Sequence, residues 1–239
     1  EMKKQLYYHI GLYQMILFSM GVDNTNELIT AGHSDEAACN ALRAEVLQNQ
    51  DMPWRSKYFA PEYFLEYQLA KVLKDNPIDE DTLVIHIRSG DIFIDKKKDY
   101  YQNPINFYIE IMKEYKKVVV VTSKDKLNPI CSELEKISKV TFQTLSMESD
   151  FNILYNSKNL ATSGVGTFPI AAALLSKELN NFYYTNLYLD EHLNPKMLKD
   201  SKIVHHKYNI NSSYIYEYEK QVDIKNLILD KSIEVQKEN

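Results

Sequence analysis

The amino-acid sequence predicts an α/β fold built on a parallel sheet. From residue 82 onward, short apolar runs rich in β-branched residues alternate with stretches of helical composition, the pattern of repeated strand–helix units. The runs at 83–87 and 118–121 are apolar along their whole length apart from His86. Such uninterrupted runs indicate strands that are buried on both faces, as they are in a parallel sheet.

Three helices are expected in the first part of the chain. Residues 4–20 repeat apolar side chains every three or four positions, and Gly21 is suited to end that helix. Residues 35–50 have helical composition, and Pro61 is placed to begin a third helix with a wide apolar stripe. The polar segment 76–80 interrupts this pattern, and we place a domain boundary there.

The second part supplies the predicted sheet. Strands are expected at 83–87, 118–121, 140–145, 159–162 and 181–184, and helices at 105–115, 129–137, 151–157, 170–175 and 223–234. We expect Ser149 and Asp150 to cap the helix at 151–157. The sequence therefore predicts three parts: a mostly helical N-terminal part at 1–80, a ligand-binding α/β domain at 81–190, and a polar, Tyr-rich tail at 191–239 whose helix packs back on the fold.

The composition argues against several classes of function. The net charge of −5 lacks the basic footprint of a general nucleic-acid-binding protein. Cys39 and Cys131 have no metal-ligand spacing, so two free thiols in a reducing compartment are the simplest interpretation, with one disulfide as the alternative. No apolar run reaches the ~18 residues of a membrane span, and the first residues show no signal-peptide pattern. We expect a cytoplasmic protein, with peripheral membrane association as the closest contact to a bilayer.

Polar residues at the end of the central strand form the first candidate site. His86, Arg88 and Asp91 follow an apolar run, and Gly90 supplies the turn. In open α/β sheets the carboxyl ends of strands are where ligands bind, and such groups are costly there unless they are paired. The alternative is structural: Arg88 pairs with Asp91, and His86 is an interior histidine with satisfied hydrogen bonds.

A second candidate lies in the glycine-containing loop at 163–168. The loop Ser163-Gly164-Val165-Gly166-Thr167-Phe168 stands between a predicted strand and the beginning of a helix. Glycines there let backbone N–H groups approach a ligand, and the helix dipole favours negative charge, so phosphate is the expected guest. The loop lacks the Gly-Lys-Ser/Thr of a Walker motif, and an ordinary tight turn is the alternative. Together with the first site, it favours a phosphate-bearing ligand.

These motifs resemble those of a known enzyme superfamily. His86-Ile87-Arg88-Ser89-Gly90-Asp91 is similar to the H-x-R-x-G-D or H-x-R-R-x-D signature of the fucosyltransferases that make α1,2 and α1,6 linkages and of protein O-fucosyltransferases. Residues 106–111, 118–125 and 150–168 resemble the later blocks of the superfamily in the same order. Residues 4–21 resemble its first helix more weakly, and the glycine-rich loop that precedes this helix in the family is absent from the sequence.

The resemblance implies a GT-B-like fold, with two Rossmann-type domains that have parallel sheets. Residues 1–80 would form an incomplete acceptor-side domain, and 81–190 would bind the nucleotide sugar without an obligatory metal. Arg88 would hold the donor pyrophosphate, for which a planar, permanently charged fork is suited. His86 would line the nucleotide site, Asp91 would orient Arg88 or its loop, and Asp150 would accept hydrogen bonds from guanine.

Further residue roles follow from the same resemblance. Gly166 and Thr167 would contact phosphate, and Ser163 and Phe168 complete the expected nucleotide-sugar-binding set. The implied reaction is an inverting displacement at the anomeric carbon, which needs a general base. Asp95 is the first candidate for that base, with Glu62 and Glu66 as alternatives. Many relatives carry a second basic residue where Ser89 stands, so one phosphate contact is expected to be missing or supplied elsewhere.

The sequence therefore predicts a glycosyltransferase that moves a sugar to a glycan or glycolipid acceptor, with GDP-fucose as the first candidate donor. No cofactor and no metal are expected. One rival is an enzyme of this fold that uses a different nucleotide-linked donor. A rival from another class is a non-catalytic nucleotide- or glycan-binding protein, and a purely structural α/β domain leaves the two candidate loops unexplained.

Overall fold

The computed structural model describes residues 75–94, 100–190, 194–220 and 223–238 of the chain. The chain divides into two units, and every described residue belongs to the second, Asp75–Asn239. The three helices expected before residue 75 lie outside the described residues, as do Glu62, Glu66 and Asp95.

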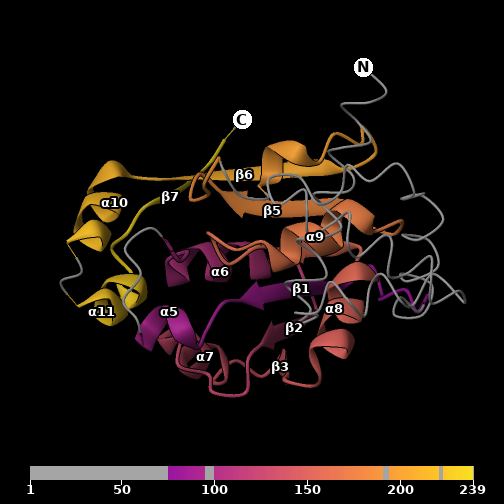
Figure 1. Ribbon diagram of the computed structural model, residues 1–239, viewed down its shortest axis with the longest axis horizontal. Coiled ribbons are helices and arrows are strands. Elements are labelled where there is room, and N and C mark those ends of the chain that lie inside the picture. The colour runs from indigo at the N-terminus through magenta and orange to yellow at the C-terminus, as the bar shows by residue number, and fades with distance from the viewer. Residues whose placement is uncertain (1–74, 95–99, 191–193, 221–222, 239) are drawn as a thin grey trace, which may run out of the picture. The chain divides into compact units, whose positions relative to one another are not determined.

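The described unit is an α/β structure with one seven-stranded sheet (Figure 1). Its strands are β1 (Thr82–Ile87), β2 (Lys117–Thr122), β3 (Val140–Gln143), β4 (Asn159–Ala161), β5 (Asn181–Thr185), β6 (Val204–Ile210) and β7 (Val235–Lys237). Its helices are α5 (Asp91–Ile94), α6 (Ile105–Met112), α7 (Pro129–Leu134), α8 (Met147–Tyr155), α9 (Phe168–Leu175), α10 (Ser212–Glu219) and α11 (Ile224–Leu229), with a short 3₁₀ helix at Pro195–Met197. The α/β prediction and its five strands are confirmed.

The strand order is β3-β2-β1-β4-β5-β6-β7, and all neighbouring pairs are parallel except β6 and β7. The first six strands therefore have the 3-2-1-4-5-6 order of doubly wound dinucleotide-binding sheets, and the unit is compatible with a Rossmann-like fold. The chain runs from β1 outward to β3, returns through α8 and continues on the other side from β4. The pair β1 and β4 is thus the switch point of the topology, where such sheets bind their ligands.

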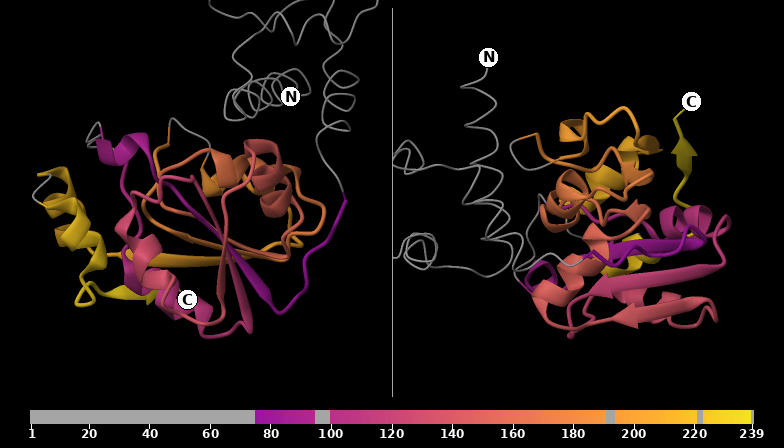
Figure 2. Two further views of the ribbon diagram at one scale, coloured as in Figure 1. Left: turned by 90° about the horizontal axis from the view of Figure 1, so that it is seen from below. Right: turned by 90° about the vertical axis from the view of Figure 1, so that its right-hand side faces the viewer.

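Helices cover both faces of the sheet (Figure 2). Leu83, Ile85 and Ile87 of β1 belong to a buried cluster with residues of α6, α7, α10 and α11. Alternation along the strand turns Val84 and His86 to the opposite face, where α8 packs against β1 and β2 and α9 packs against β4. His86 is therefore the polar residue of an otherwise apolar strand, on the face that α8 and α9 cover.

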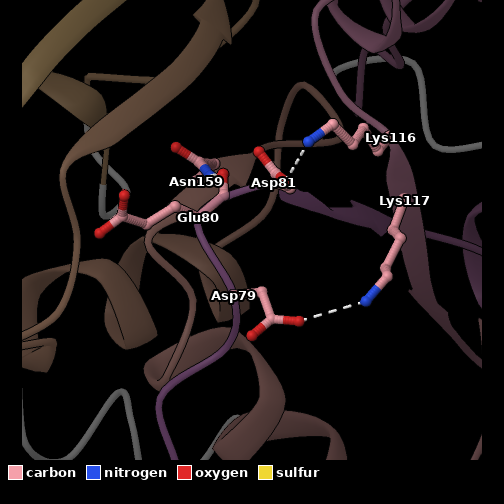
Figure 3. Close-up of polar contacts among 6 residues, drawn as sticks. All are labelled: Asp79, Glu80, Asp81, Lys116, Lys117 and Asn159. Carbon is pink, nitrogen blue, oxygen red and sulfur yellow. Dashed lines mark hydrogen bonds and ion pairs between the residues drawn. The ribbon is translucent and has the colours of Figure 1, made fainter.

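Exposed ion pairs link neighbouring strands at the amino-terminal edge of the sheet. Asp81 contacts Lys116 at 2.6 Å and Asp79 contacts Lys117 at 3.2 Å, which joins the approach to β1 with the beginning of β2 (Figure 3). The buried Asn159 side chain donates to the main-chain oxygens of Glu80 and Thr82, which fixes β4 beside β1 at the same edge. Charges at this edge are thus paired within the protein.

Three parts of the structure differ from the sequence predictions, and the first is the short helix α5 (Asp91–Ile94), which was not predicted. Helix α8 begins at Met147, four residues before the predicted start, because the Ser146 hydroxyl accepts a hydrogen bond from the Ser149 N–H and caps it. Asp150 therefore lies inside the helix and is not its cap. The segment after residue 190 adds β6, α10 and β7, none of which was predicted, and the predicted helix at 223–234 is limited to α11.

Candidate functional site

His86 lies in an aromatic environment at the carboxyl end of β1. It is 8% exposed, and its ring lies 5.5 Å from that of Phe168, which in turn lies 5.3 Å from the ring of Phe151. Phe168 begins α9 and Phe151 belongs to α8, so the two helices on this face converge on the histidine. The structure thereby brings together two of the predicted site residues, His86 and Phe168.

A hydrogen bond across the switch point joins the two candidate loops. His86 Nδ1 lies 3.3 Å from the Oγ of Ser163, which is fully buried just beyond the end of β4. Burial, assisted by the positive charge of Arg88, lowers the pKa of His86 from 6.5 to about 3. The imidazole is therefore neutral at physiological pH, and it serves as a hydrogen-bonding group beside a permanent cation.

The turn after β1 is fixed by residues that follow β2. The Asn128 side chain donates to the Arg88 main-chain oxygen at 2.9 Å, and its N–H donates to the Ser89 hydroxyl at 2.9 Å. Ser89 in turn donates to Asp125 Oδ1 at 2.7 Å. Ser89 is buried in this network. Ser89, at the position where many members of the similar superfamily carry a second basic residue, thus links the loops that follow β1 and β2.

Asp125 organises the same turn. Its carboxylate accepts hydrogen bonds from the hydroxyls of Ser89 and Ser123 and from the N–H groups of Gly90 and Leu127. Partial burial acts to raise its pKa, but these donors outweigh burial and lower it. Gly90 has a φ of +76°, and a Cβ there would lie 3.2 Å from Asp125 Oδ2, so glycine is required by the turn itself.

The first residue of α5 is Asp91, which places its backbone directly after this turn. Nothing is described of its side chain, so an interaction between Asp91 and Arg88 stays a prediction. Arg88 itself is half-buried, and its charge acts on His86. Arg88 therefore follows the carboxyl end of β1, which is one of the two strands of the switch point.

The two glycines of the loop at 163–168 differ in their surroundings. A Cβ at Gly164 would lie 2.4 Å from the main-chain oxygen of Tyr101, and its φ is +99°. Gly164 is therefore needed for a close backbone pairing, and the loop is tied there by Val165 N–H donating to Tyr101 O at 2.9 Å. A Cβ at Gly166 would meet only Ser163 Oγ, at 3.5 Å, an ordinary contact. Of the two, only Gly166 is without a structural requirement for glycine.

The beginning of α9 presents polar groups at this loop. Thr167 occupies the N-cap position, but its side chain makes no capping hydrogen bond. Pro169 stands in the first turn and contributes no N–H, so the dipole of α9 acts through the remaining donors of its first turn. The helix begins beside Phe168 and thus beside His86, which places a partial positive charge at the switch point.

Asp150 lies on the α8 side of the region. It is 8% exposed, and Oδ1 accepts a hydrogen bond from the Leu145 N–H at 3.1 Å. Burial raises its pKa, while the Leu145 hydrogen bond and the nearby positive charge of Lys124 act against that rise. Lys124 follows the carboxyl end of β2, so a second cation belongs to this edge of the sheet.

Asp125, Asn128 and Lys124 had no role in the sequence-based site. Lys124 and Asp125 come shortly after β2, and Asn128 caps the helix α7 that follows. A cluster of polar residues after an apolar strand was the signal that could have found them. Among the residues that the structure describes, no three His, Cys, Asp or Glu side chains gather as a metal site. No helix in the described part of the chain is long and apolar enough to cross a bilayer.

Comparison of the chain with protein-family models, curated proteins and solved structures finds no significant match.

Proposed function

We propose that this protein is an inverting glycosyltransferase that transfers a sugar, L-fucose from GDP-fucose in the first instance, to a hydroxyl of a glycan or glycolipid. The observation that carries the proposal is the hydrogen bond between His86 of β1 and Ser163 after β4, with the Arg88 cation beside it. It puts the two motifs on which the fucosyltransferase resemblance depends at one switch point. The pairing of this unit with a second Rossmann-type domain, as in GT-B enzymes, is part of the proposal.

The diphosphate is bound at the cationic side of the switch point. Arg88 presents a planar fork of donors to phosphate oxygens, and its charge is permanent. The first turn of α9 adds backbone donors and a favourable dipole, and the uncapped Thr167 hydroxyl contributes a further donor. The absence of a steric requirement at Gly166 supports close approach of a phosphate at that position. Binding proceeds without an obligatory metal because these groups carry the charge compensation.

The base is bound between α8 and the aromatic residues. The Asp150 carboxylate has one oxygen in the Leu145 hydrogen bond and accepts the N–H donors of guanine with the other. The neutral His86 ring and Phe168 form the apolar wall of the site. A neutral imidazole suits this place, because a second full cation would not improve recognition of an uncharged base.

In the transfer step the bond from the anomeric carbon to the β-phosphate oxygen breaks as the bond to the acceptor oxygen forms. The electron pair of the broken bond leaves with GDP, and Arg88 stabilises the charge that develops there. The acceptor proton goes to a general base, for which Asp95 is our first candidate and Glu62 and Glu66 are the alternatives. All three lie outside the described residues.

Calorimetric titration of the full chain with GDP, UDP, CDP and CMP, each with and without magnesium, tests the proposal. We expect GDP to bind and the other three to bind at least about tenfold more weakly, a difference of about 1.4 kcal/mol, with no change on adding magnesium. A preference for another nucleotide would keep a nucleotide-sugar enzyme and replace the donor. Absence of binding by all four would overturn the proposal.

A second measurement separates the enzyme from a non-catalytic binding protein. If GDP binds, hydrolysis of GDP-fucose in the absence of an acceptor and transfer to mixed glycan acceptors are measured by release of GDP. Turnover above that of an Arg88→Met variant supports catalysis. Tight binding with no GDP release from any acceptor mixture identifies a binding protein and removes the transfer step from the proposal.

A further inference from the structure

A short extended segment, residues 100–103, crosses the carboxyl edge of the sheet and contacts the loop at 163–165. We call residues 100–103 the strap. Val165 N–H donates to Tyr101 O at 2.9 Å, Asn103 N–H donates to Ser163 O at 3.1 Å, and Gln102 forms an antiparallel bridge with Gly164. The Asn103 side chain adds a bond to Thr162 O at 2.8 Å. The strap therefore determines where the backbone of Ser163 lies.

The opposite edge of the strap is held by two tyrosine hydroxyls of α10. Tyr214 donates to Gln102 O at 2.6 Å, and Tyr218 donates to Tyr100 O at 2.9 Å. The main-chain oxygens thus alternate: those of Tyr100 and Gln102 face α10, and that of Tyr101 faces the site loop, as in a strand with a neighbour on each side. The tyrosine hydroxyls take the place of a neighbouring strand.

The surroundings of Tyr214 and Tyr218 keep their hydroxyls available as hydrogen-bond donors. Both side chains are almost fully buried, and burial raises the pKa of each, so the hydroxyls remain protonated donors throughout the physiological range. Tyr101 adds a hydrogen bond from its own hydroxyl to Glu219 of α10 at 2.7 Å, and its ring lies 5.4 Å from that of Tyr218. The side of the strap toward α10 is thus fixed at three points. In Figure 1, β1 is purple and α10 is yellow, which shows that the two elements are far apart in the sequence.

We propose that Tyr214 and Tyr218 are positioning residues for the nucleotide site: they fix the strap, and the strap fixes the backbone of Ser163 beside His86. Clearance between strap and loop is already minimal, since a Cβ at Gly164 would overlap Tyr101 O. A displaced strap therefore moves the loop with it. The inference rests on the proposed function only for the identity of the ligand, since the link between α10 and the loop exists without one.

The test uses the full chain with single hydroxyl deletions. Tyr218→Phe and Tyr214→Phe each remove one donor and keep the ring. Tyr216→Phe is the matched control, because Tyr216 belongs to the same helix and is 56% exposed. The first readout is hydrogen exchange of the Val165 and Asn103 amides without ligand. We expect exchange about tenfold faster in Tyr218→Phe than in Tyr216→Phe, the factor of one hydrogen bond of about 1.4 kcal/mol.

The second readout is the affinity for GDP, measured on variants whose circular dichroism matches the parent. We expect up to about tenfold weaker binding in Tyr218→Phe and Tyr214→Phe and unchanged binding in Tyr216→Phe. Unchanged amide exchange in both buried variants would overturn the inference whether or not GDP binds. If the parent binds GDP and both variants bind it equally well, the inference also fails while the proposed function stands. If the parent binds no nucleotide, the proposed function fails and the exchange result alone decides the link.

Discussion

His86 makes the stability of this protein depend on pH in a way that one substitution can isolate. Its pKa is 6.5 in an unfolded chain and about 3 in the folded protein, because the buried site disfavours the charged imidazolium. The unfolded state therefore binds a proton more readily. The contribution of the neutral His86 side chain to the free energy of unfolding is complete above pH 6.5, and it is lost progressively as the pH falls from 6.5 toward 3. Between pH 7 and pH 5 the loss from this one group is about 2 kcal/mol.

The assay is urea unfolding followed by circular dichroism at pH 7, 6 and 5, on the parent and on His86→Gln. The glutamine keeps a hydrogen-bonding group near Ser163 but does not titrate, so its unfolding free energy should fall by about 2 kcal/mol less over this range. His206→Gln is the comparison, because burial also lowers the pKa of the partly buried His206 but shifts it less than that of His86, so its profile should differ less from that of the parent. If the unfolding free energies of the parent and of His86→Gln changed equally with pH, the reasoning would be refuted, because the imidazole would then have the same pKa in the folded and the unfolded state.

Four further substitutions test individual residues of the site region. Arg88→Lys should reduce GDP-fucose turnover by at least about 100-fold, because a point charge does not replace the bidentate fork, and near-normal turnover measured by GDP release would exclude that role. Asp150→Asn should lose the preference for GDP over UDP in calorimetry, since the amide supplies a donor where guanine needs an acceptor, and unchanged selectivity would reject the assignment. Gly164→Ala should destabilise the fold by about 3 kcal/mol or more, because its Cβ would overlap Tyr101 O. Gly166→Ala should keep the parent melting temperature and weaken GDP binding, and equal effects of the two glycine substitutions would contradict the distinction drawn between them.

The regular elements between residues 82 and 185, apart from the short helix α5, were predictable because their sequence signals are local. Runs such as 118–121 are apolar without interruption, and each is bounded by residues that begin or end helices. Strand β6 gave no such signal. Its sequence, Val-His-His-Lys-Tyr-Asn-Ile, carries four polar residues, and only Tyr208 and Ile210 are buried. A strand near the edge of the sheet needs few apolar side chains, so its pattern is weak.

The sequence indicated some residues of the candidate site, but not Asp125, Asn128 or Lys124, and it did not indicate the contacts. The sequence indicated that His86 and the loop at 163–168 follow strands of one sheet, but it contains no information on whether those strands are neighbours. The order β1-β4 supplies that information. The contacts of the strap could not be predicted for the same reason. Tyr214 and Gln102 are 112 positions apart in the chain, and no sequence periodicity indicates a hydrogen bond between a tyrosine hydroxyl and a carbonyl at that separation.

The charges at the two edges of the sheet differ in a way that supports the proposed anion site at the carboxyl edge. At the amino edge the acidic residues Asp79 and Asp81 already have lysine partners at contact distance. At the carboxyl edge the carboxylate of Asp125 accepts hydrogen bonds from four neutral donors of the turns around it. Arg88 and Lys124 follow the ends of β1 and β2, and α9 begins after β4, so two cations and the N-terminus of a helix belong to this edge of the sheet. A diphosphate carries more negative charge than any single carboxylate, so the positive groups at this edge support the proposal that the ligand is a nucleoside diphosphate.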